Sequence, residues 1–212
     1  MFPYPVKIPG IVKKIYSQYI WDIPTEENAL YLTFDDGPHP EVTAFVLDEL
    51  SKYNALATFF CIGKNVEQYP EMYKRILMEG HRVGNHTHHH LNGWETPDQE
   101  YMDDIVKANK FIDSDLFRPP YGKITSFQAR ALMGKEKKLP RDFRIIMWDV
   151  LSGDFDLKKS GVQCASDVIK KAVRGSIITF HDSEKAFLRL KVALPLVLEA
   201  FAARKFHFRT IN

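Results

Sequence analysis

The sequence predicts an α/β fold in which short strands and helices alternate around a mostly parallel sheet. Seven runs of β-branched and aromatic residues recur after residue 28, each too short for a helix. Segments whose apolar residues recur with helical spacing separate these runs. Because the chain has 212 residues, this alternation favours a single closed or nearly closed barrel.

Residues 1–28 form a lead-in interrupted by prolines, which we expect to pack on the barrel domain of residues 29–212. Within the lead-in, apolar side chains spaced four apart predict a short amphipathic helix over residues 11–21. These side chains are Ile11, Ile15 and Tyr19. The few lysines off this face are not enough for a polybasic membrane anchor. We therefore expect the helix to pack on the domain.

The predicted strands and helices follow one another through the rest of the chain. The strands are expected at residues 29–34, 57–62, 81–85, 116–118, 144–148, 176–180 and 206–211. The helices are expected at residues 42–53, 71–79, 99–112, 126–138, 162–174 and 190–203. A regular alternation of the two patterns is typical of parallel sheets covered by helices.

Composition excludes several classes of function. The net charge is only +2, which argues against a nucleic-acid partner. No apolar run approaches the roughly 20 residues of a membrane span. Prolines and lysines interrupt every stretch that could act as a secretion signal, so we expect a cytoplasmic protein. Cys61 and Cys164 are too few for a disulfide framework, and the sequence leaves the oligomeric state open.

Polar residues gather directly after the predicted strands. Taken alone, each cluster is also compatible with a turn or an exposed loop. The clusters are Asp35-Asp36-Gly37-Pro38, His86-Thr87-His88-His89-His90, Arg118-Pro119-Pro120-Tyr121-Gly122, Trp148-Asp149 with Asp154-Phe155, and His181-Asp182. The carboxyl ends of barrel strands share one rim, where active sites are built. We therefore expect the five clusters to face one another.

The residue types in these clusters favour metal-assisted hydrolysis. Adjacent carboxylates such as Asp35 and Asp36 repel each other unless a cation or an arginine neutralises them. His86 and His90 are four residues apart, which would place both imidazoles on one face of a helical turn. One carboxylate and two histidines leave open positions on a divalent zinc, iron, cobalt or nickel ion. A second carboxylate beside the metal can then act as a base, and a distant histidine can protonate the leaving group.

In order and spacing, these motifs resemble those of the polysaccharide deacetylases, the NodB-homology domains of carbohydrate esterase family 4. The matching residues are Thr33-Phe34-Asp35-Asp36-Gly37-Pro38, His86-Thr87-x-x-His90, Arg118-x-Pro120-Tyr121, Asp154 and Ile177-x-Thr179-x-His181. The resemblance covers about residues 29–212. It implies a distorted (β/α)7 barrel, similar to a TIM barrel, in a single domain.

The resemblance also implies catalytic roles for individual residues. Asp35 resembles the catalytic base, and Arg118 resembles the arginine that holds the base carboxylate in place. His181 resembles the general acid, and Asp154 the carboxylate that orients it.

Metal and substrate binding are implied in the same way. Asp36, His86 and His90 resemble the ligands of one divalent ion, for which Zn²⁺ is the first expectation and Co²⁺, Ni²⁺ or Fe²⁺ the alternatives. Tyr121 would offer its backbone N–H to the oxyanion of the tetrahedral intermediate, and Pro120 is assigned with it to substrate binding.

Two positions depart from the family pattern. Phe155 stands where the family usually has tryptophan, and Thr179 stands where it usually has leucine. In the family these positions line the pocket for the acetyl methyl group. The substitutions leave the catalytic residues in place, but we expect them to alter acyl preference and efficiency.

Three functional hypotheses follow. The first is hydrolysis of the N-acetyl group on N-acetylglucosamine-type residues of a polysaccharide or oligosaccharide. The second is hydrolysis of an O-acetyl ester or another amide by the same fold. The third is a carbohydrate-binding protein without catalysis. Binding alone needs neither Asp35 nor His181, so their presence together with Arg118 disfavours the third hypothesis.

Overall fold

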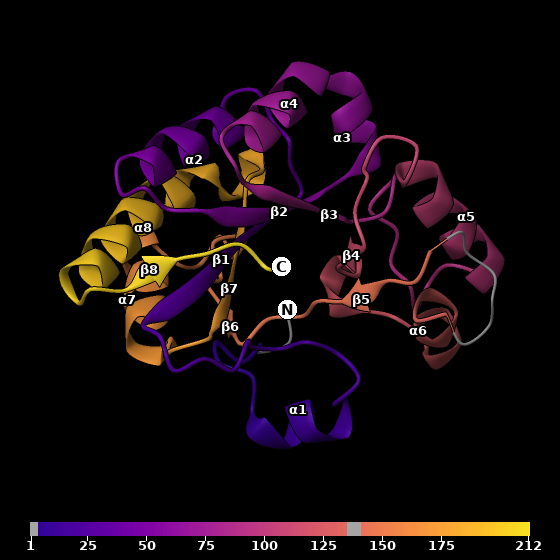
Figure 1. Cartoon of the computed structure of the whole chain (residues 1–212), viewed down its shortest axis with the longest axis horizontal. Helices are drawn as coiled ribbons and strands as arrows, with labels where there is room; N and C mark the ends of the chain where they lie inside the picture. Colours follow the sequence, from indigo (N-terminus) through magenta and orange to yellow (C-terminus); the bar gives the residue numbers. More distant parts are fainter. Residues whose placement is uncertain (1–3, 135–140) are drawn as a thin grey trace.

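In the computed structural model, which describes residues 4–134 and 141–212, eight strands lie at the centre and helices surround them (Figure 1). The strands are β1 (Ala29–Asp35), β2 (Ala57–Cys61), β3 (Arg82–Asn85), β4 (Leu116–Phe117), β5 (Arg144–Ile145), β6 (Val150–Leu151), β7 (Ile177–His181) and β8 (His207–Phe208). Their order is β5-β4-β3-β2-β1-β7-β6, and β8 pairs with β1. The ladders between these described strands are parallel, which confirms the predicted α/β class.

The sheet curls into a half-barrel, and one predicted strand is divided at its open side. The sequence predicts a single strand over residues 144–148, but the chain forms β5 and β6 on either side of residues 146–149. These two strands are the opposite ends of the sheet path. The short connection therefore joins the two ends of the curled sheet, which gives the distorted barrel that the family resemblance implies.

Strand β1 explains how the fold delivers polar side chains to the interior. Leu30, Leu32 and Phe34 belong to the large core cluster beneath the helices. The alternate residue Tyr31 packs in the inner cluster with Phe60. Successive side chains of a strand point to opposite faces, so the strand delivers the side chains of alternate residues to the barrel interior.

Eight helices are present in the described part of the chain. They are α1 (Gly10–Ile15), α2 (Val42–Ser51), α3 (Gly63–Gln68), α4 (Pro70–Met78), α5 (Asp98–Ala108), α6 (Ser126–Leu132), α7 (Gly161–Lys171) and α8 (Glu184–Ala203). In Figure 1, α2, α7 and α8 lie on one side of the strands and α5 and α6 on the other. None of the helices in the described residues is long and apolar enough to cross a membrane.

Helices α2, α5 and α7 end two to four residues before the predicted boundaries, and three other differences are larger. Helix α3 was not predicted, because only Gly63 and Val66 of its six residues are buried and no apolar period is visible. Helix α8 begins at Glu184, earlier than predicted, with an acidic residue in its first turn. The predicted helix over 126–138 ends at Leu132, and its residues 135–138 lie outside the described residues.

The lead-in packs differently from the prediction. Helix α1 is only six residues long, and Ile11 and Ile15 are both 64% exposed, so the predicted apolar face was wrong. Val12 packs against the neighbouring core cluster instead. The segment before the helix runs antiparallel to β6, and its Ile8 N–H donates to the Asp149 carbonyl at 2.9 Å. These contacts hold the start of the helix in place.

Candidate active site

Asp35 and Arg118 form a buried ion pair inside the barrel. Asp35 ends β1 and is 3% exposed, and Arg118, which follows β4, is fully buried. Arg118 Nη1 donates to Asp35 Oδ1 at 2.6 Å and to Thr33 Oγ1 at 2.7 Å. Burial lowers the pKa of Arg118 below its ordinary value, although the Asp35 carboxylate beside it acts to raise that pKa.

Other groups hold the Arg118 guanidinium in one orientation. It donates to the carbonyls of Ile146 at 3.2 Å and Met147 at 2.8 Å, in the connection between β5 and β6. Its carbon also lies 4.1 Å from the centre of the Phe60 ring. The Asp35 carboxylate is therefore bound by a guanidinium group that neighbouring groups hold in one orientation.

Asp36, His86 and His90 come together at the end of β1. One ligand atom from each residue lies within 4.8 Å of the others. Asp36 Oδ1 is 3.2 Å from His90 Nε2 and 3.8 Å from His86 Nε2. This separation fits three ligands arranged around one divalent ion, each at about 2.0–2.2 Å from it.

The second nitrogen of each histidine already has a partner. His86 Nδ1 donates to the Arg118 carbonyl at 2.8 Å, and His90 Nδ1 forms a hydrogen bond with the Tyr121 hydroxyl at 3.1 Å. Such partners fix the orientation of ligating imidazoles and leave Nε2 free for the metal. The Tyr121 hydroxyl contact was not predicted, because the sequence pointed only to the backbone of this residue.

Charge favours the ligand forms of these side chains. Burial lowers the pKa of His86 to about 4, so its imidazole is neutral near pH 7. Burial acts to raise the pKa of Asp36, but the hydrogen bond with His90 and the nearby His181 and His86 outweigh it and hold that pKa below its usual range. Deprotonated carboxylate and neutral imidazole are the forms that bind metal ions.

The loop carrying the two histidines is not the helical turn that their spacing predicts. Residues 86–90 have no regular structure, and Thr87 and His90 adopt φ values of 63° and 57°. Asn85 Oδ1 accepts the Thr87 N–H at 2.8 Å, which turns the chain at the end of β3. The ring centres of His86 and His90 lie 5.0 Å apart, so a loop with left-handed residues brings them together instead.

Asp104 on α5 holds the middle of this loop. One of its carboxylate oxygens accepts the N–H groups of His88 at 2.8 Å and His89 at 2.9 Å, and the other pairs with His89 Nδ1 at 2.5 Å. His88 is buried with its ring 5.6 Å from that of Phe111. The sequence assigned no role to His88 and His89. Their contacts with Asp104 anchor the loop that carries His86 and His90.

His181 lies beside Asp35 on the neighbouring strand. The two residues are register partners where β1 pairs with β7. His181 Nδ1 donates to Asp154 Oδ1 at 2.7 Å, and its backbone N–H donates to Asp154 Oδ2 at 2.8 Å. Burial acts to lower the pKa of His181, but Asp154 outweighs it and raises the pKa to about 9. A protonated imidazole near the base is the state a general acid needs.

The loop after β4 presents Tyr121 to the cavity. Tyr121 is 63% exposed and has φ +60°, within the short 3-10 turn Pro120–Gly122. Pro120, assigned to substrate binding from the sequence, is buried, and the adjacent Pro119 lines the cavity in its place.

A cavity of about 620 Å³ opens between these residues. One set of its lining residues, here called the polar group, consists of Asp35, Asp36, His86, His90 and Tyr121. A second set, here called the apolar group, consists of Tyr4, Trp148, Leu151, Phe155 and Thr179. His181 lines the cavity together with both groups. A cavity with convergent polar groups and perturbed pKa values is the expected form of an active site.

Two carboxylates of the predicted rim are used elsewhere. Asp149 accepts from Lys7 at 2.8 Å and from Lys13 at 2.5 Å, so it holds the lead-in. Asp182 accepts the Gly37 N–H at 3.0 Å and the Thr43 hydroxyl at 2.5 Å. Neither is among the residues that line the cavity.

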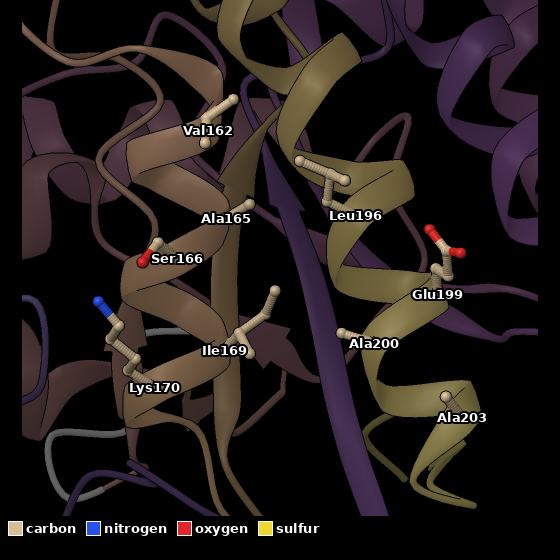
Figure 2. Close-up of a pocket in the computed structure, with 9 residues that line it drawn as sticks. All are labelled: Val162, Ala165, Ser166, Ile169, Lys170, Leu196, Glu199, Ala200 and Ala203. Carbon is tan, nitrogen blue, oxygen red and sulfur yellow. The ribbon is translucent and has the colours of Figure 1, made fainter.

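A second hollow lies between α7 and α8 (Figure 2). Ile169 and Leu196 point into the space between the two helices, and Lys170 and Glu199 lie at its edges. None of its lining residues is a histidine or an aspartate. Glu199 is the one carboxylate among these lining residues, so the hollow does not bring together the cluster of carboxylates and histidines found at the strand ends.

A parallel half-barrel that brings together a metal-ligand cluster, an arginine-held carboxylate and an aspartate-held histidine at its strand ends belongs to the class of metal-dependent hydrolases. More specifically, the chain belongs to the polysaccharide deacetylase family, whose model matches residues 22–134. A peptidoglycan-N-acetylglucosamine deacetylase of Bacillus cereus is 33% identical over 198 residues, covering 91% of this chain and 90% of that protein.

Two further comparisons agree. A chitooligosaccharide deacetylase of Azorhizobium caulinodans is 32% identical over 76% of this chain and 76% of that protein. The crystal structure of the Bc1960 peptidoglycan N-acetylglucosamine deacetylase superposes with a TM-score of 0.84 at 30% identity, covering 96% of this chain and 95% of that one. The family and the half-barrel fold expected from the motifs are therefore confirmed.

Proposed function

We propose that this protein hydrolyses the N-acetyl group of N-acetylglucosamine residues in peptidoglycan or in a related N-acetylated oligosaccharide. The observation that carries the proposal is the pairing of Asp35 with His181 across neighbouring strands, beside the cluster formed by Asp36, His86 and His90. An amide requires both a base for the attacking water and an acid for the leaving nitrogen. The names of the similar proteins support the same substrate class.

The metal site is proposed to hold Zn²⁺ through Asp36, His86 and His90. A set of two imidazoles and one carboxylate suits zinc and leaves positions open for water and substrate, although cobalt, nickel or iron fits the same donors. When bound, the ion supplies Lewis-acid polarisation of the acetyl carbonyl and of the attacking water.

The protein side chains carry the two proton transfers. Asp35 takes a proton from the attacking water, and Arg118 holds its carboxylate toward the cavity at 2.6 Å. His181 donates a proton to the leaving nitrogen, and Asp154 keeps it protonated and oriented at 2.7 Å. The backbone N–H of Tyr121 is proposed to stabilise the oxyanion that develops on the acetyl oxygen.

Hydrolysis of an O-acetyl ester is the second candidate, because the same groups could attack an acetyl ester. The raised pKa of His181, due to Asp154, favours the amide. An amine leaving group needs protonation before it departs, whereas an alcohol is a better leaving group and depends less on a protonated group beside it.

The proposal is tested by measuring acetate released from chitooligosaccharides, peptidoglycan fragments and acetylxylan by the zinc-loaded protein. We expect release from the N-acetylated substrates and a much smaller rate with acetylxylan. Asp35→Asn serves as the matched inactive control. Acetate released from acetylxylan alone, or from none of the three substrates, would contradict the proposed function.

A further inference from the structure

Tyr4 of the lead-in forms part of the active-site cavity. It lines the same cavity as Asp35 and His181, although it lies outside the residues that match the family model. Two backbone bonds fix the segment that follows it. Leu151 N–H donates to the Val6 carbonyl at 2.8 Å, and Ile8 N–H donates to the Asp149 carbonyl at 2.9 Å. The lead-in is therefore held against β6, which brings Tyr4 to the cavity.

The Tyr4 ring continues an aromatic wall toward the proposed general acid. Its centroid lies 5.0 Å from that of Phe155, and the Phe155 centroid lies 5.2 Å from that of His181. The Tyr4 hydroxyl donates to Asp156 Oδ2 at 3.1 Å. A Cβ atom at Gly153 would lie only 2.6 Å from this hydroxyl oxygen, so the glycine makes the close approach possible. Both the ring and its hydroxyl are thus held in position.

We propose that Tyr4 is a specificity-determining residue that, together with Phe155, encloses the acyl group of the substrate. This inference rests on the proposed deacetylase function. Phenylalanine at position 155 offers less aromatic area than tryptophan, and the second ring supplies apolar area beside it. A wall built from two rings limits the length of the acyl chain that the cavity accepts. Removing the outer ring leaves room for a longer chain.

The test compares acetyl and propionyl versions of one chitooligosaccharide with wild-type protein and three variants. Tyr4→Ala should lower kcat/KM for the acetyl substrate by roughly three- to tenfold, mainly through KM, and lower the acetyl-to-propionyl ratio. Tyr4→Phe should keep that ratio, because the ring remains. Tyr16→Ala removes a 47% exposed aromatic residue of the same lead-in, which does not line the cavity, and should behave like wild type.

The acetyl-to-propionyl ratio separates a specificity role from a structural one. A variant whose fold is merely weakened loses activity on both substrates equally. A Tyr4→Ala protein with an unchanged ratio therefore overturns the inference, whatever its absolute activity. If Tyr4→Ala changes the ratio and Tyr16→Ala changes it equally, the effect belongs to the lead-in as a whole and the inference also fails. A wild-type protein that releases no acetate defeats the proposed function itself, and the inference with it.

Discussion

The polar group and the apolar group of the cavity are assembled in different ways. The polar group comes from short motifs at the carboxyl ends of β1, β3 and β4. The apolar group draws on the lead-in, on β6 and on β7, and its members Tyr4, Phe155 and Thr179 are far apart in the sequence. Metal binding and proton transfer require particular residue types, whereas an apolar wall requires only area, which many side chains from many segments can supply.

The largest effect is expected when two of the proposed metal ligands in the polar group are removed. His86→Ala combined with His90→Ala should abolish metal binding and lower acetate release by roughly 10³-fold or more. Elemental analysis measures the bound metal. His207→Ala is the matched control, because His207 is exposed on β8 and is not one of the clustered ligands. Stoichiometric metal in the double variant would contradict the assignment of the ligands.

His181 lines the cavity together with both groups. Its removal should slow hydrolysis by an amount that depends on the leaving group of the substrate. His181→Ala should lower kcat for an N-acetyl substrate by about 10²- to 10³-fold with a smaller change in KM. The loss should be smaller for an O-acetyl ester of similar size, since its leaving group needs less protonation. Equal losses on the amide and the ester would count against His181 as the acid.

The contrast between the two groups also explains what could be predicted from the sequence. The polar group was predictable because Asp35, Asp36, His86 and His90 are residue types that bind metals or transfer protons and directly follow predicted strands. The parallel sheet was predictable from the alternation of strand and helix patterns. The exchange of Pro120 for Pro119 and the loop conformation at residues 86–90 were not, because left-handed residues such as Thr87 leave no periodic signal.

The apolar group was less predictable for a physical reason. Phe155 and Thr179 could be assigned to it only through the family resemblance, and Tyr4 was missed entirely. Lys7 and Lys13 gave no sign that they pair with Asp149, a contact that spans most of the chain. Such long-range contacts depend on the completed fold, so local sequence patterns do not contain them.

Breaking the Asp149 contacts should weaken the segment that brings Tyr4 to the cavity. Asp149→Asn should lower the free energy of unfolding near pH 7 by about 1–3 kcal/mol, because the lysines lose a buried charged partner. Urea unfolding measures the change. Asp113→Asn is the matched control, since Asp113 forms a surface pair with Arg141 and is 89% exposed at its side chain, so its change should stay within about 0.5 kcal/mol.

This stabilisation should depend on pH. Burial acts to raise the pKa of Asp149, but hydrogen bonds from Lys13, Lys7 and Ser176 outweigh it and lower the pKa. A lowered folded-state pKa gives stability that is present above the unfolded pKa of about 3.9 and lost as the pH falls through the folded value. The difference between wild type and Asp149→Asn should therefore shrink below about pH 4. A difference that stays constant between pH 7 and pH 3 would rule out the charge as its source.

The smallest effect is expected within the apolar group. Thr179 Oγ1 lies 3.1 Å from Thr33 Oγ1, which accepts a hydrogen bond from Arg118. Thr179→Leu should add apolar area to the proposed acyl pocket, raise kcat/KM for an acetyl substrate by up to about tenfold, and reduce tolerance for a propionyl group. Thr179→Val is the matched control, because it removes the hydroxyl without adding length. An unchanged acetyl-to-propionyl ratio in Thr179→Leu would reject the pocket argument.

The central claim is that Asp35 acts as the base beside a metal held by Asp36, His86 and His90. The direct test is to measure acetate release and metal content together in Asp35→Asn. Acetate release from N-acetylated chitooligosaccharide should fall by about 10²- to 10⁴-fold while the metal content stays equal to that of wild type. Acetate release near the wild-type rate would contradict the role of Asp35, and loss of the metal would place Asp35 among the ligands instead.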